Sequence, residues 1–557
     1  MTRTKCRNLL IALPLAATLG ILAGCAAVTT ATSSSSSISV AADVTAAEVL
    51  ADNEAAFAGE TEYDAASATS IDLGDTDGDT LTITEAGTYV LSGTLAGRVV
   101  VDAEGADVTL VLDGVDITSS TTAALAATAV ENLSVTLAEG STNTLADTAS
   151  YADDAEVNAA LYSAGDLQIS GDGALTVTGN GNDGIASKDG LTISGGEITV
   201  DAVDDGIRGK DSLVVTGGAL DVTAGGDGLS SDNEDDADRG YIAISDGTLA
   251  VTSGGDALSA QTDLVITGGT LELAAGGGST ASLADGDSAK ALKGLTYVVV
   301  EGGTVTADAA DDAVHSNGAV HLAGGDLSLA SGDDAVHADT ALLIDGGTVD
   351  VTASYEGLES TVITVAGGDV SIVASDDGVN GSDGSGESMG SVAGVSVTIS
   401  GGTLVVDAQG DGLDSNGDLT ITGGETTVNG PTDSGNGALD ANGTFTVSGG
   451  VLAAAGSSGM AVSPSADSSQ VSASATFDTQ PAGSVVTVVD SDGAEVGSFT
   501  SSKEFSSLVY SSADIQSGVE YSFAVDGAVV ATATGGEALA GGMGGPGGGQ
   551  GGGPGDR

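Results

Sequence analysis

Apolar and polar residues alternate in short runs along most of the chain. One representative stretch reads Leu191-Thr192-Ile193, then Ile198-Thr199-Val200, with a further apolar residue at Ile207. A period of two predicts β-strands, because successive side chains of a strand point to opposite faces. The 3.6-residue period of amphipathic helices is absent, which excludes a helical repeat protein.

The strands recur at a fixed interval, which two motifs mark. In the first, a small pair, usually Gly-Gly, precedes each alternating run. The second member of this pair is found at Gly196, Gly218, Gly247, Gly269, Gly303, Gly325, Gly347, Gly368, Gly402, Gly424 and Gly450. The interval is about 22 residues, as from Gly196 to Gly218, and some repeats carry a short insertion. In phase with it runs a second motif, Asp followed by Gly or Ala and then Ile, Val or Leu. Its aspartates are Asp183, Asp205, Asp227, Asp256, Asp312, Asp334, Asp377 and Asp411.

Three short strands in each repeat, separated by Gly and Asp turns, predict one coil of a solenoid. The expected fold is therefore all-β, a right-handed single-stranded parallel β-helix with about 22 residues per coil. Glycine would supply the left-handed turn conformations. Sandwiches built from hairpins would not hold such a period.

The repeat sets the domain boundaries. We assign residues 65–465 to the β-helix. Residues 466–535 lose the repeat and contain runs such as Val485-Val486-Thr487-Val488-Val489. We expect them to form a small β cap, since an open strand edge invites aggregation. The glycine-rich residues 536–557 are expected to be disordered.

The start of the chain indicates export. Residues 1–24 have a basic beginning and an interrupted apolar run, which is typical of a signal peptide. The run ends in Leu22-Ala23-Gly24-Cys25, the lipobox of bacterial lipoproteins. We expect acylation of Cys25 and an extracytoplasmic protein whose only membrane contact is this lipid anchor. The alternative is an ordinary secretory signal with a chance cysteine. Residues 25–64, rich in Ser, Thr and Ala, would form a flexible tether.

The charge is extreme, with 80 acidic and 12 basic residues and a formal net charge of −68. Such an acidic chain is a poor partner for nucleic acid or anionic lipid, and it needs cations to screen its self-repulsion. It contains no Trp, which argues against a flat aromatic platform for crystalline cellulose. We expect a monomer.

Several segments carry a resemblance to a known family. They include residues 85–93 (EAGTYVLSG), 184–189 (GIASKD), 204–211 (DDGIRGKD), 315–318 (HSNG) and 435–440 (GNGALD). With them the chain, over about residues 65–530, resembles the carbohydrate-binding parallel β-helix family of cellulolytic clostridia, which is related in fold to calcium-dependent pectate lyases. The resemblance implies calcium binding, affinity for cellulose and acidic pectic sugars, and no demonstrated catalysis.

The recurring aspartates are the candidate calcium ligands. Stacked on successive coils, they would lie about 5 Å apart and repel one another. Calcium, which takes six to eight oxygen ligands, would relieve that repulsion. The alternative is that each aspartate only accepts hydrogen bonds from turn backbone. The candidates are Asp204, Asp205, Asp227, Asp311, Asp312, Asp333, Asp334, Asp376 and Asp377.

Basic residues and histidines form two further candidate groups. We expect Lys188, Arg208 and Lys210 to cluster on adjacent coils and to bind a sugar carboxylate, with Arg208 offering a bidentate fork. Local neutralisation of nearby aspartates is the alternative. His315 and His337 are one period apart, so they should stack. Their ladder is either a plain surface feature or a site for a transition metal.

Three functions remain open from the sequence. The first is a non-catalytic cell-surface protein that binds polysaccharide with the help of calcium. The second is a calcium-dependent polysaccharide lyase, with Lys210 or Lys188 as base. The third is a structural adhesin or spacer. The sequence offers no obvious paired acid and base, so we assign no catalytic residue.

Overall fold

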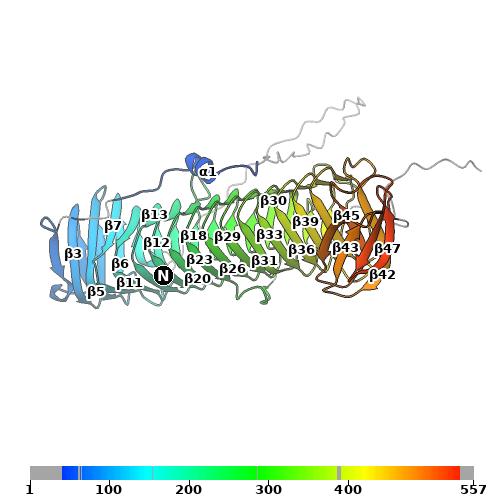
Figure 1. The fold of residues 1–557 in the computed structure, drawn as a ribbon. Coiled ribbons are helices and arrows are strands. Elements are labelled where there is room, and N and C mark those ends of the chain that lie inside the picture. Colours follow the sequence, from blue (N-terminus) through cyan, green and yellow to red (C-terminus); the bar gives the residue numbers. More distant parts are fainter. Residues whose placement is uncertain are drawn as a thin grey trace, which may run out of the picture. The chain divides into compact units, whose positions relative to one another are not determined.

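The structure is a computed structural model that describes residues 41–59, 63, 65–152, 155–284, 286–384 and 390–539. The predicted signal peptide and Cys25 lie outside the described residues, as do residues 540–557. The described part is nearly all β (Figure 1). It contains a 43-stranded, mostly parallel sheet and a four-stranded antiparallel sheet. In this part of the chain, no helix is both long and apolar enough to cross a membrane.

Strands of the large sheet pair in three parallel series, here called ladders A, B and C. Ladder A consists of β2 (Thr80–Ile83), β4 (Arg98–Asp102), β6 (Leu125–Ala129), β9 (Ala159–Ser163), β12 (Asp183–Ser187), β15 (Ile207–Gly209), β18 (Leu229–Ser231), β21 (Leu258–Ala260), β24 (Leu292–Gly294), β27 (Val314–Ser316), β30 (Val336–Ile344), β32 (Leu358–Val365), β34 (Val379–Gly381) and β37 (Leu413–Ser415). Ladder B consists of β1 (Thr69–Asp72), β3 (Gly87–Leu95), β5 (Asp107–Thr118), β7 (Asn132–Leu137), β10 (Asp166–Gly171), β13 (Gly190–Ile193), β16 (Ser212–Val215), β19 (Tyr241–Ile244), β22 (Asp263–Ile266), β25 (Tyr297–Val300), β28 (Ala319–Leu322), the long strands β30 and β32, β35 (Ser396–Ile399), β38 (Asp418–Ile421) and β40 (Phe445–Val447).

Ladder C begins with β3 and β5, which run through two ladders. It continues through β8 (Thr142–Ala146), β11 (Ala174–Gly179), β14 (Glu197–Ala202), β17 (Ala219–Ala224), β20 (Thr248–Ser253), β23 (Thr270–Ala275), β26 (Thr304–Ala309), β29 (Asp326–Ser331), β31 (Thr348–Ser354), β33 (Asp369–Ala374), β36 (Thr403–Ala408), β39 (Glu425–Asn429) and β41 (Val451–Gly456). A short 3-10 helix, η1 (Leu73–Asp75), follows β1.

The repeat places equivalent residues side by side. In ladder A, Ile185 lies opposite Ile207, and Ile207 lies opposite Leu229. Each step is 22 residues, so the interval found in the sequence is the register of the parallel pairing. Where a loop is inserted, as between Leu229 and Leu258, the next strand still pairs in register. The interval therefore decides which side chains become neighbours.

Alternation within each strand separates the core from the surface. In β14, Ile198 and Val200 are buried, whereas Glu197, Thr199 and Asp201 are exposed. The inward residues are almost all Val, Ile, Leu and Ala, and they form one continuous core along the stack. Each inward side chain packs against those of the strands before and after it in the ladder. This burial of apolar surface supplies the main stabilising term of the fold.

The Gly-Gly pairs have the expected left-handed backbone at their second member. Gly196 has φ of +98° and Gly218 has φ of +95°. An L side chain is strained at such an angle. A Cβ on Gly218 would also lie 3.1 Å from backbone atoms of Gly195 and Gly196 on the coil before it. Both the turn and the close stacking of coils therefore require glycine here.

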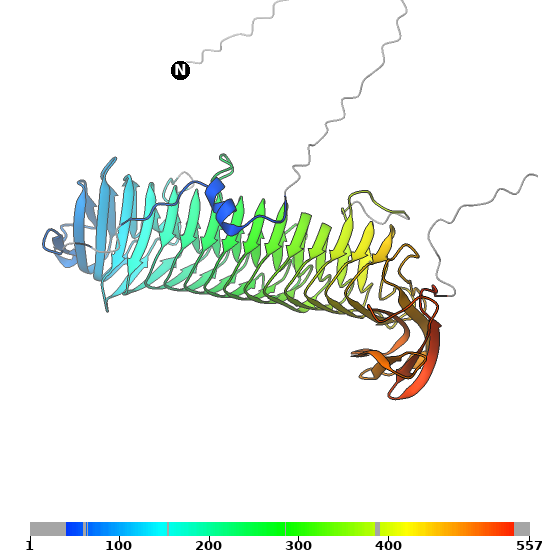
Figure 2. The same cartoon turned by 45° about the horizontal axis from the view of Figure 1, so that its top comes forward.

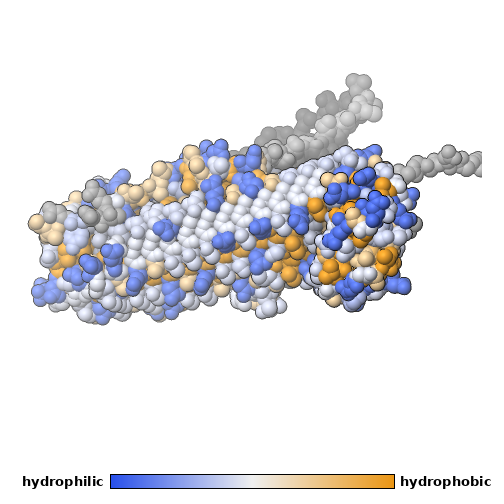
Figure 3. Space-filling model, in the orientation of Figure 1, coloured by the Kyte–Doolittle hydropathy of each residue, from blue (hydrophilic) through white to orange (hydrophobic). Residues whose placement is uncertain are grey.

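Residues 472–534 form an antiparallel unit at the last coil. Strand β45 (Phe505–Ser511) pairs antiparallel with β41 on one side and with β42 (Ser472–Gln480) on the other. The four-stranded sheet is ordered β44 (Glu495–Thr500), β43 (Val485–Val489), β46 (Glu520–Val525) and β47 (Ala528–Thr534). The antiparallel unit has a core of its own, in which Phe505, Tyr521 and Phe523 are buried. Orange, hydrophobic residues are prominent over these strands, whereas much of the visible face of the stack is of intermediate hydropathy (Figure 3).

Residues 41–59, here called the strap, pack against ladder B. Their helix α1 (Ala46–Asp52) begins at a capping box of Thr45 and Glu48 and lies against the green part of the stack (Figure 2). Ala46 and Val49 are buried against Val265 and Val299. The expectation of a flexible tether over residues 25–64 is therefore wrong for this segment. Its Ser, Thr and Ala content favoured disorder, but two buried apolar residues and a capped helix are enough to seat it on a preformed surface.

Polar contacts hold the strap along its whole length. Glu301 Oε1 accepts a hydrogen bond from the backbone N of Ala46 at 2.8 Å. The Tyr241 hydroxyl donates to the Glu54 carbonyl at 2.8 Å, and the Thr192 hydroxyl donates to the Phe57 carbonyl at 2.7 Å. These partners are spread over several coils, so the strap ties successive coils to one another.

Candidate functional site

Two columns of side chains run along the turn that leads into ladder A. The turn column consists of the residues two positions before the first inward residue of each strand: Asp183, Asp205, Asp227, Asp256, Lys290, Asp312, Asp334, Glu356, Asp377 and Asp411. The strand column consists of the residues three positions further on: Ala186, Arg208, Ser230, Ser259, Lys293, His315, His337, Glu359, Asn380 and Asp414. Both columns carry much of the candidate chemistry found in the sequence.

In the turn column, one carboxylate oxygen is used to join coils. Asp205 Oδ1 accepts a hydrogen bond from the backbone N of Asp227 at 2.9 Å. Asp227 Oδ1 in turn accepts from the N of Asp256 at 2.8 Å, and Asp377 Oδ1 accepts from the N of Asp411 at 2.6 Å. These aspartates thus accept hydrogen bonds from backbone N–H groups, as the turn alternative supposed. The donors belong to the next coil, and only Oδ1 is used.

The second oxygen faces the strand column. Asp256 Oδ2 accepts a hydrogen bond from Lys293 Nζ at 2.6 Å, and Asp312 Oδ2 lies 2.8 Å from His315 Nδ1. At the first coils the partner is weaker, since the Ser230 hydroxyl donates to Asp205 Oδ2 at 3.1 Å. The residue in the strand column therefore helps to decide how well each of these carboxylates is neutralised.

The middle of the columns is neutralised by lysine. Lys290 Nζ lies 2.5 Å from Asp311 Oδ2 and 3.1 Å from Asp312 Oδ2. Burial would raise the pKa of Asp312, but the hydrogen bond from His315 and the charge of Lys290 lower it below its usual value. Asp333 is exposed and lies within 4.8 Å of this pair. The predicted calcium ligands Asp311, Asp312 and Asp333 are thus brought together, around a lysine.

The first coils of the two columns, those of Asp183 and Asp205, carry the predicted basic cluster. The guanidinium of Arg208 donates two hydrogen bonds to Asp232 Oδ2, at 3.0 and 2.7 Å, and lies 4.0 Å from Asp183. Its fork is therefore already engaged by a residue of the inserted loop, as the neutralisation alternative supposed. Lys210 Nζ lies 3.9 Å from the exposed Asp235.

Lys188 differs from these two bases. In the part of the chain that the structure describes, its amine has no carboxylate within 4.0 Å. Burial and the positive charge of Arg208 lower the pKa of Lys188, and Lys210 adds to the effect. The three bases therefore lie close enough to influence one another.

The predicted aspartates of the first coils are less well provided with cations. Asp204 is exposed, whereas Asp205 and Asp227 are partly buried. Burial and the charges of Asp256 and Asp205 raise the pKa of Asp227 to about 6. Burial and Asp205 likewise raise the pKa of Asp183 to about 7. These carboxyl groups are close to one another and repel, as the sequence predicted.

At the last coils the columns contain only acidic and amide side chains. Among the described residues, no Lys, Arg or His lies within 4.0 Å of Asp377, Asp411, Asp414 or Asp440. Burial, together with Asp377, Asp411 and Asp440, raises the pKa of Asp414 to about 8. Burial and the charge of Asp411 raise the pKa of Asp377 to about 7. The predicted ligand Asp376 is half-buried beside Asp377.

The sequence did not predict that three of these residues form a group. One carboxylate oxygen from each of Asp411, Asp414 and Asp440 lies within 4.8 Å of the others. Asp411 was found as part of the repeat motif, but Asp414 belongs to the strand column, which that motif does not include. The signal that could have found it is the spacing Asp-x-x-Asp within one coil, because both residues face outward on the same side of the turn.

The histidines stack as the sequence predicted. The rings of His315 and His337 lie 5.0 Å apart and are inclined by 15°. Each accepts or donates a hydrogen bond to the aspartate three residues earlier, at 2.8 Å for Asp312 and 2.9 Å for Asp334. His337 additionally lies 2.9 Å from Glu359, which the sequence analysis did not single out.

Fold and site together define a parallel β-repeat protein with a buried, only partly neutralised column of carboxylates. Sequence comparison then places it more closely. The profile of the family described as carbohydrate-binding domain-containing protein matches residues 77–335 and 334–498, and the chain belongs to this family.

Comparison with known proteins gives two further similarities. A carbohydrate-binding domain-containing protein of Acetivibrio thermocellus is 40% identical over 126 residues, which is 22% of this chain and 44% of the relative. The match thus spans less than half of that relative. A solved structure titled as a polysaccharide lyase-like protein from C. thermocellum, gadolinium derivative, is 28% identical and has a TM-score of 0.35. That match covers 46% of this chain and 95% of the solved one.

Proposed function

We propose that this protein is a non-catalytic, calcium-dependent polysaccharide-binding protein, and that acidic sugars are its preferred ligands. The three ladders are taken to be those of a right-handed parallel β-helix with 22-residue coils. The observation that carries the proposal is the un-neutralised acidic end of the two columns, in a chain that belongs to a carbohydrate-binding family.

The residues at this end fit calcium. They are Asp377, Asp411, Asp414 and Asp440, whose oxygens are the hard donors that calcium prefers. Burial and, after it, the charges of neighbouring carboxylates raise the pKa values of Asp377 and Asp414, and a bound dication would offset that repulsion. At Asp311 and Asp312 the fit is poorer, because Lys290 already supplies the positive charge.

Calcium at such a site can also hold the ligand. A cation bound by two or three protein carboxylates keeps coordination positions for other oxygens. A uronate carboxylate can fill them, so that one calcium ion joins protein and polysaccharide. In so acidic a protein, an acidic sugar would otherwise be repelled.

The cellular context is proposed from the sequence. Acylation of Cys25 would anchor the protein outside the cytoplasm at the membrane surface. The strap begins the described structure at residue 41 and is bound to ladder B, so residues 26–40 would remain to connect it to the lipid.

Binding to a glycan array, run with calcium and again with chelator, tests the proposal. We expect polygalacturonate to be retained with calcium and lost with chelator. The double variant Asp414→Asn, Asp440→Asn should weaken this binding at least about tenfold, since charge-assisted contacts contribute roughly 1.5–3 kcal/mol. Asp221→Asn, on the exposed face of β17, is the matched control and should bind normally. Equal binding with and without calcium would contradict the proposal.

One observation favours a second function, that of a lyase. A lysine with a lowered pKa, such as Lys188, suits a base that removes a sugar proton. Such an enzyme would release unsaturated product, followed by its ultraviolet absorbance, and Lys188→Ala would abolish it. Binding of polygalacturonate without any absorbance change supports the non-catalytic function.

A further inference from the structure

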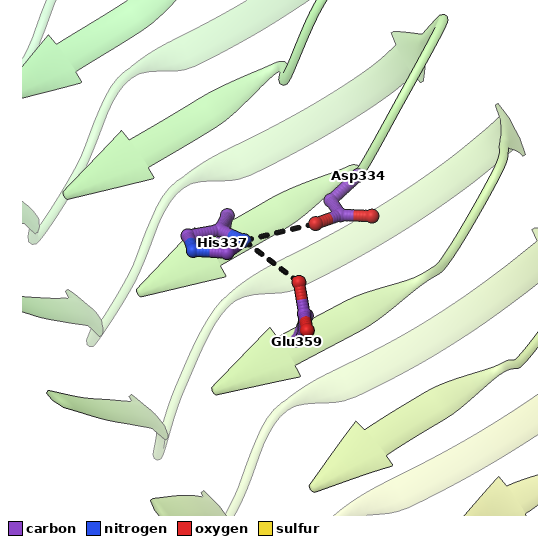
Figure 4. A group of neighbouring side chains, drawn as sticks. All are labelled: Asp334, His337 and Glu359. Carbon is purple, nitrogen blue, oxygen red and sulfur yellow. Dashed lines mark hydrogen bonds and ion pairs between the residues drawn. The ribbon is translucent and has the colours of Figure 1, made fainter. Parts of the chain in front are cut away.

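A histidine and two carboxylates meet at one point of the two columns. His337 Nδ1 lies 2.9 Å from Asp334 Oδ2 and 2.9 Å from Glu359 Oε2 (Figure 4). His337 and Glu359 are partners in the register of β30 and β32, and Asp334 belongs to the turn before β30. The one-coil spacing therefore places the three side chains together. We propose that Asp334, His337 and Glu359 bind a divalent transition-metal ion, with Zn²⁺ as the best match.

The hydrogen-bonding partners of the ring support metal ligation through Nδ1. A single nitrogen can donate at most one proton, yet two carboxylates face Nδ1. On the other side of the ring, Nε2 lies 3.1 Å from Asp339 Oδ1. With its proton on Nε2, the imidazole donates to Asp339 and turns the lone pair of Nδ1 toward Asp334 and Glu359. A carboxylate behind the ring is the usual support of a metal-binding histidine.

The separations between the donor atoms suit a small cation. Zinc bonds to histidine nitrogen and carboxylate oxygen measure about 2.0–2.2 Å, so neighbouring ligands lie about 3–3.5 Å apart. The two observed separations of 2.9 Å are just below this range, and all three atoms lie within 4.8 Å of one another. Only small shifts of the side chains would be needed to surround an ion.

The donor set and its surroundings indicate which ion. Calcium prefers oxygen donors alone, whereas imidazole favours zinc and other transition metals. A dication with two carboxylates is neutral, which removes the like-charge conflict of the pair. Beside the three residues lies a hollow of about 300 Å³ lined by His337, Glu359 and Ser360. Ser360 is 2% exposed and, within the described structure, its hydroxyl has no hydrogen-bond partner, so this hollow can admit further ligands.

The neighbouring coil provides a matched comparison. His315 has the same aspartate contact through Asp312, but its partner in the next coil is His337 and not an acid. Asp312 is also paired with Lys290, at 3.1 Å. The difference between the two histidines is thus the second carboxylate, which only His337 receives.

The test uses the full chain. Binding of Zn²⁺ is measured by calorimetry, and the coordination of Cu²⁺ is measured by electron paramagnetic resonance. We expect the wild type to bind one Zn²⁺ at this site and the Cu²⁺ spectrum to show coupling to one imidazole nitrogen. His337→Gln should remove that coupling and lower Zn²⁺ affinity at least about 100-fold, and Asp339→Asn should lower it about 10–100-fold. His315→Gln should leave both signals unchanged.

Other results would overturn the proposal. A folded His337→Gln protein that keeps the nitrogen coupling and the wild-type affinity would show that another site holds the ion. Displacement of Zn²⁺ by equimolar Ca²⁺ would do the same, because it would mean an oxygen-only site. Should His337→Gln fail to fold, Glu359→Gln answers the same question, since it keeps the shape of the side chain. Polysaccharide binding is not the readout, so this result stands or falls apart from the proposed function.

Discussion

At the scale of single residues, three aspartates of the turn column use their two oxygens separately. In Asp205, Asp256 and Asp312, Oδ1 accepts a hydrogen bond from the backbone N of the next coil, and Oδ2 contacts a side chain of the strand column. The sequence offered a turn role and a cation role as alternatives. The geometry allows both at the same residue, because the two oxygens of a carboxylate accept independently.

Asp414→Asn should therefore have an effect that depends on pH. The folded pKa of Asp414 is about 8 and its usual value is 3.8, so between these values the folded protein holds a proton that the unfolded chain has lost. Its contribution to stability consequently falls as the pH rises through that window. Without divalent cations, the variant should be more stable than the wild type by roughly 1 kcal/mol or more at pH 8.5 and about equal to it near pH 4. Urea unfolding at the two pH values measures this, and an equal effect at both would contradict the assigned cause.

Asp227 allows the Oδ1 contact to be isolated. Asp227→Asn keeps an oxygen that can accept a hydrogen bond from the backbone N of Asp256. It also removes the Asp227 carboxyl group, whose pKa is raised mainly by burial. Asp227→Ala leaves that N–H without a partner, which costs about 1–3 kcal/mol. We expect the alanine variant to lose that much stability in chelator and the asparagine variant to lose none. Equal losses in both would mean that the charge, and not the acceptor, matters.

At the scale of elements, pattern alone predicted the parallel pairing and the two faces of each strand. The 22-residue interval became the register, and it correctly placed His315 against His337. It could not reveal the group Asp411, Asp414 and Asp440, because a longer coil separates Asp414 from Asp440. The strap was missed for a different reason. Its helix packs on Val265 and Val299, which are far away in the sequence, and the local sequence carried just the capping box of Thr45 and Glu48 as a sign.

Val49→Asp should release the strap. Val49 is buried against ladder B, and a charge placed there would have no partner. We expect amides of residues 46–57 to exchange much faster in the variant, while the strands of ladder C keep wild-type protection. Ala47→Asp, on the exposed side of the same helix, adds the same charge and is the control. Loss of protection across all ladders would show instead that the strap is required for the stack itself.

At the scale of the whole molecule, the full chain carries a formal net charge of −68. Within the two columns, Arg208 lies at the first coils, and Lys290, Lys293, His315 and His337 lie in the middle. The last coils have no such base among the described residues, so protons and metal ions would compete there for the carboxylate oxygens.

Calcium should accordingly raise the melting temperature, and more so at high pH. An ion that binds only the folded state stabilises it by about 2.7 kcal/mol at a hundred times its dissociation constant. At pH 8 most carboxyl groups with raised pKa have lost their protons, so we expect a clear shift there and a much smaller one at pH 5. Calorimetry with calcium and with chelator at both pH values gives the answer, with magnesium as the control. The absence of a shift at millimolar calcium would contradict a calcium site in the columns.

The antiparallel pairing of β45 with β41 has a consequence for how copies of the chain can join. Parallel stacking would let the last coil of one molecule accept the first coil of another, and repetition of that step would produce a fibre. In ladder C the hydrogen-bonding edge of β41 is already taken by a strand running the opposite way. Contacts through this ladder can then form only between two first coils, which closes after a pair. Addition of further copies through ladder C is therefore blocked at the last coil.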